Sequence, residues 1–193
     1  MHFQYAPGAT PLDPDEAAGL IPSHIATQGD LNVWEEANIL QGARWAMRQK
    51  KRDILEEGFL RDLHKQMFDR TWTWAGTFRA SNKNIGVDWA QVAVSLRDLL
   101  DNTRYQIEHQ TFSFDELVVR FHHRLVWIHA FPNGNGRHAR LMADVLAMRL
   151  GLPRFSWGGN LLASGGVLRQ NYLEALRTAD AGRMDDLLHF ARS

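Results

Sequence analysis

The stretch that decides the fold is HAFPNGNGRHAR, residues 129–140. It joins two runs of apolar residues that recur every three or four positions, the spacing of a buried helical face. The members of these runs are Leu117, Phe121, Leu125 and Ile128 before it, and Leu141, Val145 and Met148 after it. The sequence therefore predicts two helices joined by a short, flexible and positively charged turn.

The backbone of this turn is suited to an anion. Gly134 and Gly136 allow positive φ angles and close approach of a ligand, and Pro132 is expected to end the first helix. Consecutive N–H groups in such a turn can form an anion-binding nest. The second helix is predicted to begin near Asn135 or Gly136, so its unpaired N–H groups and partial positive charge lie at the same place.

Three side chains complete a candidate phosphate site. Arg137 and Arg140 are three residues apart, so both guanidinium groups can reach one phosphate chain. His129 stands at the entrance of the turn, and an imidazole is suited to general-base work near neutral pH. Taken alone, a glycine-rich turn is typically structural and a pair of arginines typically lies on a solvated face. A single histidine is typically a hydrogen-bonded core or surface residue. Together they favour a polyphosphate site.

Length and composition set the class of protein. The chain has 193 residues, of which 45% are hydrophobic, enough for one globular domain with a sizeable core. Its net charge is zero, so we expect neither direct nucleic-acid binding nor attraction to an acidic membrane. The absence of cysteine excludes disulfides and thiolate catalysis. With no signal peptide and no apolar run of roughly 20 residues, a cytoplasmic location outside the membrane is expected.

The rest of the chain is predicted to be mainly helical. Closely spaced prolines mark residues 1–14 as an N-terminal arm, and residues 15–193 form a single domain. Asp30 is a candidate cap for a helix that runs past Trp45. Residues 71–87 have no helical period, and their central SNKN suits the tip of a small β-hairpin. Further helices are expected to start at Asp88 and Ser113 and to cover residues 167–179 and 184–191.

HAFPNGNGRHAR closely resembles the Fic signature HxFx(D/E)GNGRxxR, which is long and specific. The resemblance continues upstream in LRDLHKQMF and WTWAGTFR (residues 60–68 and 72–79) and downstream in NYLEALRTADAGRMDDLLHF (residues 171–190). GLIPSHIATQGDLNVWEEANI (residues 19–39) resembles the segment that leads into Fic domains, and also the subgroup called mobile mystery protein B. The resemblance implies a Fic fold with residues 129–140 at its centre.

A Fic protein of this type typically transfers AMP from ATP to a Ser, Thr or Tyr hydroxyl of a target protein. By position, His129 would be the general base. Arg137 and Arg140 would hold the β- and γ-phosphates, and Asn135 would help to orient the α-phosphate. The anion-binding turn would consist of Gly134, Asn135 and Gly136. The flap that binds the target backbone by strand addition would consist of Asn82, Lys83, Asn84, Ile85, Gly86 and Val87.

Two positions depart from the family pattern. Ala130 replaces the usual proline, which changes the stiffness of the loop more than its chemistry. Asn133 stands where the family has an acidic Mg²⁺ ligand, and an amide oxygen lacks the charge of a carboxylate. Mg²⁺ is still expected, since ATP supplies its own phosphate oxygens. Two alternatives stay open: a catalytically weak or silent nucleotide-binding module, and transfer or removal of another phosphate-containing group. The intact GNGR argues against the Doc-like variant, which has ANKR.

Regulation is less evident in the sequence. Many Fic proteins are restrained by a glutamate in the motif (S/T)xxxE(G/N), which pairs with the second arginine of the signature, here Arg140. Residues 32–37 place Glu36 at the glutamate position, with the first and last positions different. An ordinary surface carboxylate is the alternative, and a separate inhibitory or antitoxin-like protein is then an expected partner. His138 falls at a variable position of the signature and is expected to face solvent.

Overall fold

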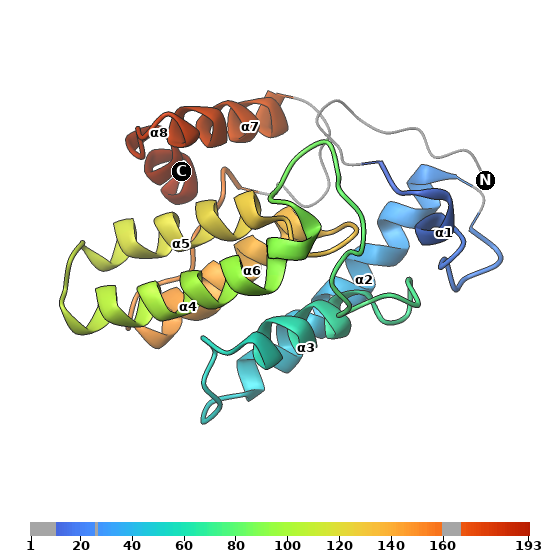
Figure 1. The fold of residues 1–193 in the computed structure, drawn as a ribbon, viewed down its shortest axis with the longest axis horizontal. Helices are drawn as coiled ribbons and strands as arrows, with labels where there is room; N and C mark the ends of the chain where they lie inside the picture. Colours follow the sequence, from blue (N-terminus) through green and yellow to red (C-terminus); the bar gives the residue numbers. More distant parts are fainter. Residues whose placement is uncertain (1–10, 26, 160–166) are drawn as a thin grey trace.

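The helices on either side of the turn at residues 129–134 form the centre of the molecule (Figure 1). They are α5 (Phe114–Ile128) and α6 (Asn135–Arg149), which pack along each other in a computed structural model that describes residues 11–25, 27–159 and 167–193. Helix α4 (Val92–Glu108) packs on α5 and is preceded by a 3-10 turn, η1 (Trp89–Gln91). The turn between α5 and α6 is thus held by two packed helices.

Two further helix pairs enclose this centre. The first pair is α2 (Gln28–Arg48) with α3 (Glu57–Phe68), and both helices contact α6. The second pair is α7 (Val167–Asp180) with α8 (Asp185–Arg192), of which α8 contacts α5. A short N-terminal helix, α1 (Pro14–Ala17), lies at the α2 side of the molecule (Figure 1). The described residues contain no helix that is long and apolar enough to cross a membrane.

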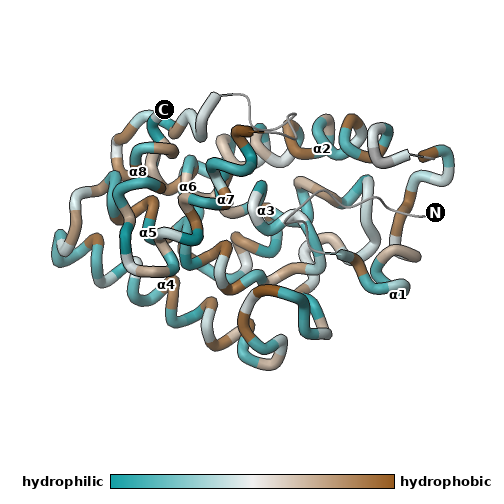
Figure 2. The backbone as a smooth tube through the Cα atoms, turned by 90° about the horizontal axis from the view of Figure 1, so that it is seen from above, coloured by the Kyte–Doolittle hydropathy of each residue, from teal (hydrophilic) through white to brown (hydrophobic). Residues whose placement is uncertain are grey.

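The predicted apolar faces are buried. The residues of α3 and α5 that recur at helical spacing, and those of the facing side of α6, have exposed fractions of 7% or less: Phe59, Leu63, Met67, Leu117, Phe121, Leu125, Ile128, Leu141 and Val145. Full burial of one such side chain stabilises a fold by roughly 1.5–3 kcal/mol. Hydrophobic and hydrophilic residues alternate along α2 and α4 in Figure 2, as expected of helices with one buried face.

The caps explain where the helices begin. Ser113 accepts a hydrogen bond from the Glu116 N–H at 3.3 Å, which confirms the predicted start of α5. For α2 the cap is Thr27 rather than Asp30. The Thr27 hydroxyl accepts from the Asp30 N–H at 3.1 Å, and the Asp30 carboxylate accepts from the Thr27 N–H at 3.0 Å. Thr27 and Asp30 therefore form a capping box, in which Asp30 is the third residue of the helix. The helix begins three residues earlier than predicted.

The predicted β-hairpin over residues 71–87 is wrong. Within the described ranges there is an isolated antiparallel bridge between Leu20 and Trp72, and residues 71–87 form no strand pair. Backbone groups that would pair the two strands of a hairpin form hydrogen bonds with side chains instead. The Arg79 guanidinium donates to the carbonyls of Ser81, at 2.8 Å, and of Val87. The segment is consequently an irregular loop wrapped around one arginine.

The predicted arm, residues 1–14, falls largely outside the described residues, which begin at residue 11. The last residues of the predicted arm already belong to α1, because Pro14 is its first residue and Asp13 its N-cap. The Asp13 N–H donates to the Glu16 carboxylate at 2.8 Å. Proline at the first helical position costs no hydrogen bond, which is why the helix can begin there.

Candidate active site

The turn between α5 and α6 contains two residues with left-handed backbone conformation. His129 ends α5 with a φ of +54°, and Gly134 is the N-cap of α6 with a φ of +78°. The first helix therefore ends at His129, before Pro132. A Cβ atom on Gly134 would lie 2.6 Å from Cζ of Phe68, so both conformation and space require glycine there. Gly136 lies inside α6 and does not use its freedom to adopt positive φ.

Asn135 holds the shape of the turn. Its side-chain oxygen accepts from the Phe131 N–H at 2.9 Å, and its amide nitrogen donates to the Phe131 carbonyl at 2.8 Å. The side chain is 5% exposed. Because both ends of the amide are engaged within the loop, Asn135 faces an anion through its backbone N–H. The first intrahelical bond of α6 runs from His138 to Gly134, which leaves the N–H groups of residues 135–137 without helical acceptors.

The two signature arginines have different surroundings. Arg137 pairs with the Glu35 carboxylate on α2 at 2.6 Å and lies over the Phe68 ring. Arg140 lies 5.1 Å from the centroid of the Tyr172 ring and forms no ion pair with any described residue. Of the two guanidinium groups, the one of Arg140 is therefore the more available to an incoming anion.

The glutamate that reaches the signature is Glu35, while Glu36 lies on the exposed side of α2. Glu35 is 4% exposed, and its second oxygen accepts from the Trp72 indole N–H at 2.8 Å. The arginine that it contacts is Arg137, the first of the signature, and not Arg140 as the family motif implies. Adjacent helical residues differ by about 100° in direction, so a shift of one position changes which carboxylate faces the site.

His129 is buried beneath the loop 79–88. The Arg79 Nε atom donates to the His129 carbonyl at 2.6 Å, and a Cβ atom on Gly86 would lie 2.7 Å from Cβ of His129. The His129 side chain is 6% exposed. Burial, together with the positive charges of Arg79 and Lys83, lowers the pKa of His129 to about 4. At neutral pH the imidazole is thus uncharged and able to accept a proton.

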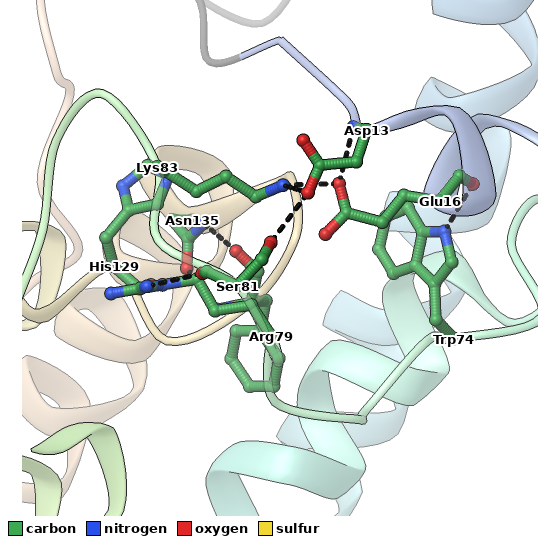
Figure 3. A network of polar contacts seen from close by, with 9 residues as sticks. Asp13, Glu16, Trp74, Arg79, Ser81, Lys83, His129 and Asn135 are labelled. Atoms are coloured by element: carbon green, nitrogen blue, oxygen red, sulfur yellow. Dashed lines mark hydrogen bonds and ion pairs between the residues drawn. The ribbon is translucent and has the colours of Figure 1, made fainter. Parts of the chain in front are cut away.

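The N-terminal segment fixes the loop over His129 through one lysine (Figure 3). The Lys83 ammonium group contacts the Asp13 carboxylate at 2.7 Å and the Glu16 carboxylate at 2.5 Å, and the lysine side chain is 2% exposed. The Ser81 hydroxyl donates to Asp13 at 2.6 Å. The Trp74 indole donates to the Glu16 carbonyl at 2.9 Å. Four polar contacts therefore tie α1 to the chain on both sides of Arg79.

Of the other predicted flap residues, Val87 is partly buried against the core and the rest lie at the surface. Asn84, Ile85 and Gly86 are exposed, and Ile85 is 47% exposed. Asn82 accepts a hydrogen bond from the Trp89 N–H at 2.8 Å and donates to Asp88 at 3.1 Å. The loop therefore has one end fixed at η1 and an exposed tip, but its backbone does not have the strand conformation expected for pairing with a target.

Two buried histidines support the signature from α3 and α6. His64 accepts from the Gly76 N–H at Nδ1 and contacts the Asn133 carbonyl at Nε2, at 3.0 and 3.1 Å, and its ring stacks on Phe131 at 3.7 Å. His138 is 1% exposed and contacts the Leu60 carbonyl at 2.9 Å, so the expectation that it faces solvent is wrong. Burial lowers the pKa of both side chains, that of His138 to about 4.

The residues present do not fit a resident Mg²⁺. The Asn133 side-chain oxygen accepts from the Gly134 N–H at 2.6 Å and lies 3.5 Å from an Arg137 guanidinium nitrogen. A neutral oxygen beside a cation is a poor ligand for a hard dication, which prefers carboxylates. The part of the chain that the structure describes contains no cluster of three or more His, Asp or Glu side chains able to hold a metal. A Mg²⁺ ion would therefore enter as part of the nucleotide complex.

Comparisons with known proteins agree with this geometry. Residues 54–147 match the model of the Fic/DOC family. Two curated relatives are the protein adenylyltransferase Fic of Nematostella vectensis, 34% identical over 79 residues, and the protein adenylyltransferase fic-1 of Caenorhabditis elegans, 33% identical over 85 residues. These matches cover 39% and 41% of this chain and 16% of each relative, so the chain spans a small part of their length.

Solved structures show the same fold. The BepC protein of Bartonella tribocorum with bound AMPPNP aligns with a TM-score of 0.69 and 16% identity, over 93% of this chain and 97% of that chain. The N-terminal FIC domain of Bep8 from Bartonella sp. 1-1C aligns with a TM-score of 0.69 and 16% identity, over 88% of both chains. A fragment of Fic-1 from C. elegans aligns with a TM-score of 0.65 and 21% identity, over 91% of this chain and 51% of that chain.

Several residues at the site were not predicted from the sequence. The signature is contacted from other elements by Glu35, Arg79 and His64. The loop over His129 is held through Lys83 by Asp13 and Glu16. Arg79 and His64 lie in WTWAGTFR and LRDLHKQMF, so the signal that could have found them was the resemblance of those two segments to the family. Glu35 lies in residues 19–39, which carry the same resemblance, whereas Asp13 and Glu16 gave no such signal.

Proposed function

We propose that this chain is a protein adenylyltransferase that uses ATP and modifies a Ser, Thr or Tyr hydroxyl of a target protein. The observation that carries this proposal is the placement of His129. Its uncharged imidazole lies at one end of a turn whose other end presents the N–H groups of residues 135–137, which have no acceptor within the helix. Arg140 projects from the next turn of the same helix and has no carboxylate partner among the described residues.

The chemistry follows from these positions. The target oxygen attacks the α-phosphorus of ATP, a new P–O bond forms, and the bond to the β-phosphate breaks. The hydroxyl proton passes to His129, and pyrophosphate leaves with its charge balanced by Arg140 and the N-terminus of α6. Arg137 also balances this charge once its ion pair with Glu35 is broken. Positioning and electrostatics supply most of the rate enhancement in such reactions. Mg²⁺ belongs to the substrate, as the MgATP complex.

A catalytically silent nucleotide-binding module is the second candidate. Asn133 favours it, since an amide replaces the expected acid, and the Arg137–Glu35 pair occupies one of the two phosphate-binding arginines. A cytoplasmic location, an inhibitory or antitoxin-like partner, and membership of the mobile mystery protein B subgroup also stay predictions. Transfer or removal of a different phosphate-containing group remains the alternative within enzymes.

The test uses α-labelled ATP with Mg²⁺ or Mn²⁺, cell extract, the purified protein and its His129→Ala variant. We expect label on protein that requires His129, with a mass increase equal to one adenylyl group, which is AMP less water. ATP binding without covalent label under every condition would favour the silent module. A mass increase equal to phosphate would contradict the choice of AMP as the transferred group.

A further inference from the structure

Arg169, on the first turn of α7, is a charged side chain that the mechanism above does not use. Its Nε atom is buried and has no hydrogen-bond partner. It forms no ion pair with any residue that the structure describes, and no carboxylate influences its pKa. A buried guanidinium donor without an acceptor is costly to a fold. An anionic ligand from outside the chain would remove this cost.

Arg169 adjoins the phosphate site. It lies three residues before Tyr172, on the same side of α7. The Tyr172 hydroxyl reaches the first turn of α6, because a Cβ atom on Gly136 would lie 3.8 Å from it. The Arg140 guanidinium lies over the Tyr172 ring. In addition to burial, the charges of Arg140 and Arg137 lower the pKa of Arg169, so the three cations share one region.

The Tyr172 hydroxyl is held in place from the opposite side. His122 on α5 contacts it at 3.1 Å through Nε2 and is fully buried. Burial and the charge of Arg140 lower the pKa of His122 to about 3, so this imidazole is neutral and adds no positive charge. The Tyr172 ring below Arg140 is therefore held in place by an uncharged partner. Arg140 and Arg169 supply the positive charge at this end of the site.

The charges around Arg140 and Arg169 indicate which part of a ligand these two arginines would bind. Arg137 is neutralised by Glu35, whereas Arg140 and Arg169 have no carboxylate partner in the described part of the chain. Two uncompensated guanidinium groups beside a helix N-terminus suit a group with several negative charges. The terminal phosphate of a nucleoside triphosphate meets this requirement better than the shorter phosphate chain of a diphosphate.

We propose that Arg169 is a nucleotide-binding residue that contacts, together with Arg140, the terminal phosphate of a nucleoside triphosphate. It makes the site select triphosphates over diphosphates. This inference rests on the proposed function, because it specifies the ligand of the same site. It concerns binding alone and does not require that AMP be transferred.

The experiment is calorimetric titration of ATP and of ADP, each with Mg²⁺, into the full chain. The variants are Arg169→Ala and, as a matched control from the exposed side of the same helix, Arg177→Ala. Loss of one charge-assisted contact should weaken ATP binding roughly 10- to 100-fold in Arg169→Ala. Binding of ADP should change little. Arg177→Ala should bind both nucleotides like the unaltered protein.

The outcomes separate this inference from the proposed function. Unaltered protein that binds neither nucleotide would overturn both. ATP binding that is unchanged in Arg169→Ala, or an equal loss for ATP and ADP, would overturn the role of Arg169 and leave the proposed function standing. A thermal melt without nucleotide checks that the variant is folded. Arg169→Gln, which keeps the stem of the side chain, gives the same test if the alanine variant does not fold.

Discussion

Glu35 and Arg137 are separated by 102 positions and form an ion pair of 2.6 Å, in which the carboxylate is 5% exposed. The pair joins α2 to the first turn of α6, at the place where we propose that phosphate binds. An anion that uses Arg137 must compete with this carboxylate. The pair therefore keeps the proposed nucleotide site partly occupied by the protein itself.

Replacement of Glu35 by glutamine should strengthen ATP binding. Glutamine keeps an acceptor for the Trp72 indole but removes the charge that holds Arg137. Release of one charge-assisted contact of 1–2 kcal/mol corresponds to roughly 5- to 30-fold tighter binding. Calorimetry on Glu35→Gln measures this, and Glu36→Gln, on the exposed side of α2, is the matched control. Equal affinities in all three proteins would show that the pair does not restrain the site.

Replacement of Lys83 by methionine should raise the pKa of His129 from about 4 toward its ordinary value of 6.5. The variant removes a nearby positive charge and frees the negative charges of Asp13 and Glu16, and both effects favour the protonated imidazole. The titration of the His129 ring signal by NMR gives the value directly. Lys65→Met, an exposed lysine of α3, is the control and should leave that signal unchanged. An unaltered titration in Lys83→Met would contradict the role assigned to the lysine.

The loop over His129 should open when its carboxylate partners are removed. In the double variant Asp13→Asn and Glu16→Gln, Lys83 becomes a buried charge without a partner, which is strongly unfavourable. We expect faster amide hydrogen exchange across residues 79–88, because this segment no longer stays closed. Asp15→Asn alters an exposed carboxylate of the same short helix and should leave exchange as it was. Exchange that is equally slow in the double variant would show that Arg79 alone holds the loop.

The fold should lose stability in mild acid. Burial lowers the folded-state pKa of His122 to about 3, of His129 and His138 to about 4, and of His64 well below 6.5. These groups bind protons in the unfolded chain below pH 6.5 but not in the folded one. Stability is therefore fully present above pH 6.5 and falls as the pH drops from 6.5 toward 4. Each such histidine contributes up to about 1.4 kcal/mol per pH unit in this window.

Urea unfolding at several pH values between 7 and 4.5 measures this slope. His138→Gln, whose amide can still donate to the Leu60 carbonyl, should have a shallower slope than the unaltered protein. An identical slope would mean that His138 titrates alike in the folded and unfolded states.

The sequence predicts the helices well because their apolar residues repeat with a helical period. It fails at residues 71–87, where the structure depends on the Arg79 side chain and its contacts with carbonyl groups of the loop and of His129. It offers Glu36 as a candidate inhibitory residue beside the alternative of an ordinary surface carboxylate, whereas the carboxylate that reaches the signature is that of Glu35. Leu31, Glu35 and Ile39 recur every four residues, so the helical period places Glu35 on the buried face of α2. The sequence does not show that this face meets Trp72 and Arg137.

The signature can be recognised in the sequence residue by residue, but the long-range contacts that support it cannot. His64 lies 69 positions before Asn133, and Lys83 lies 70 positions after Asp13. Such contacts are set by the packing of helices that are distant in the chain. A histidine or lysine within a helix or loop looks the same in sequence whether it is solvated or buried at a site.

The contacts of Lys83 also have a practical consequence for any shortened version of the protein. The predicted boundary between arm and domain, after residue 14, passes through the set of charges that closes the loop over His129. A fragment that begins at residue 15 keeps the carboxylate of Glu16 but lacks that of Asp13, and with it the acceptor of the Ser81 hydroxyl. Differences in activity between such a fragment and the full chain would then reflect a missing carboxylate rather than the loss of a separate regulatory region.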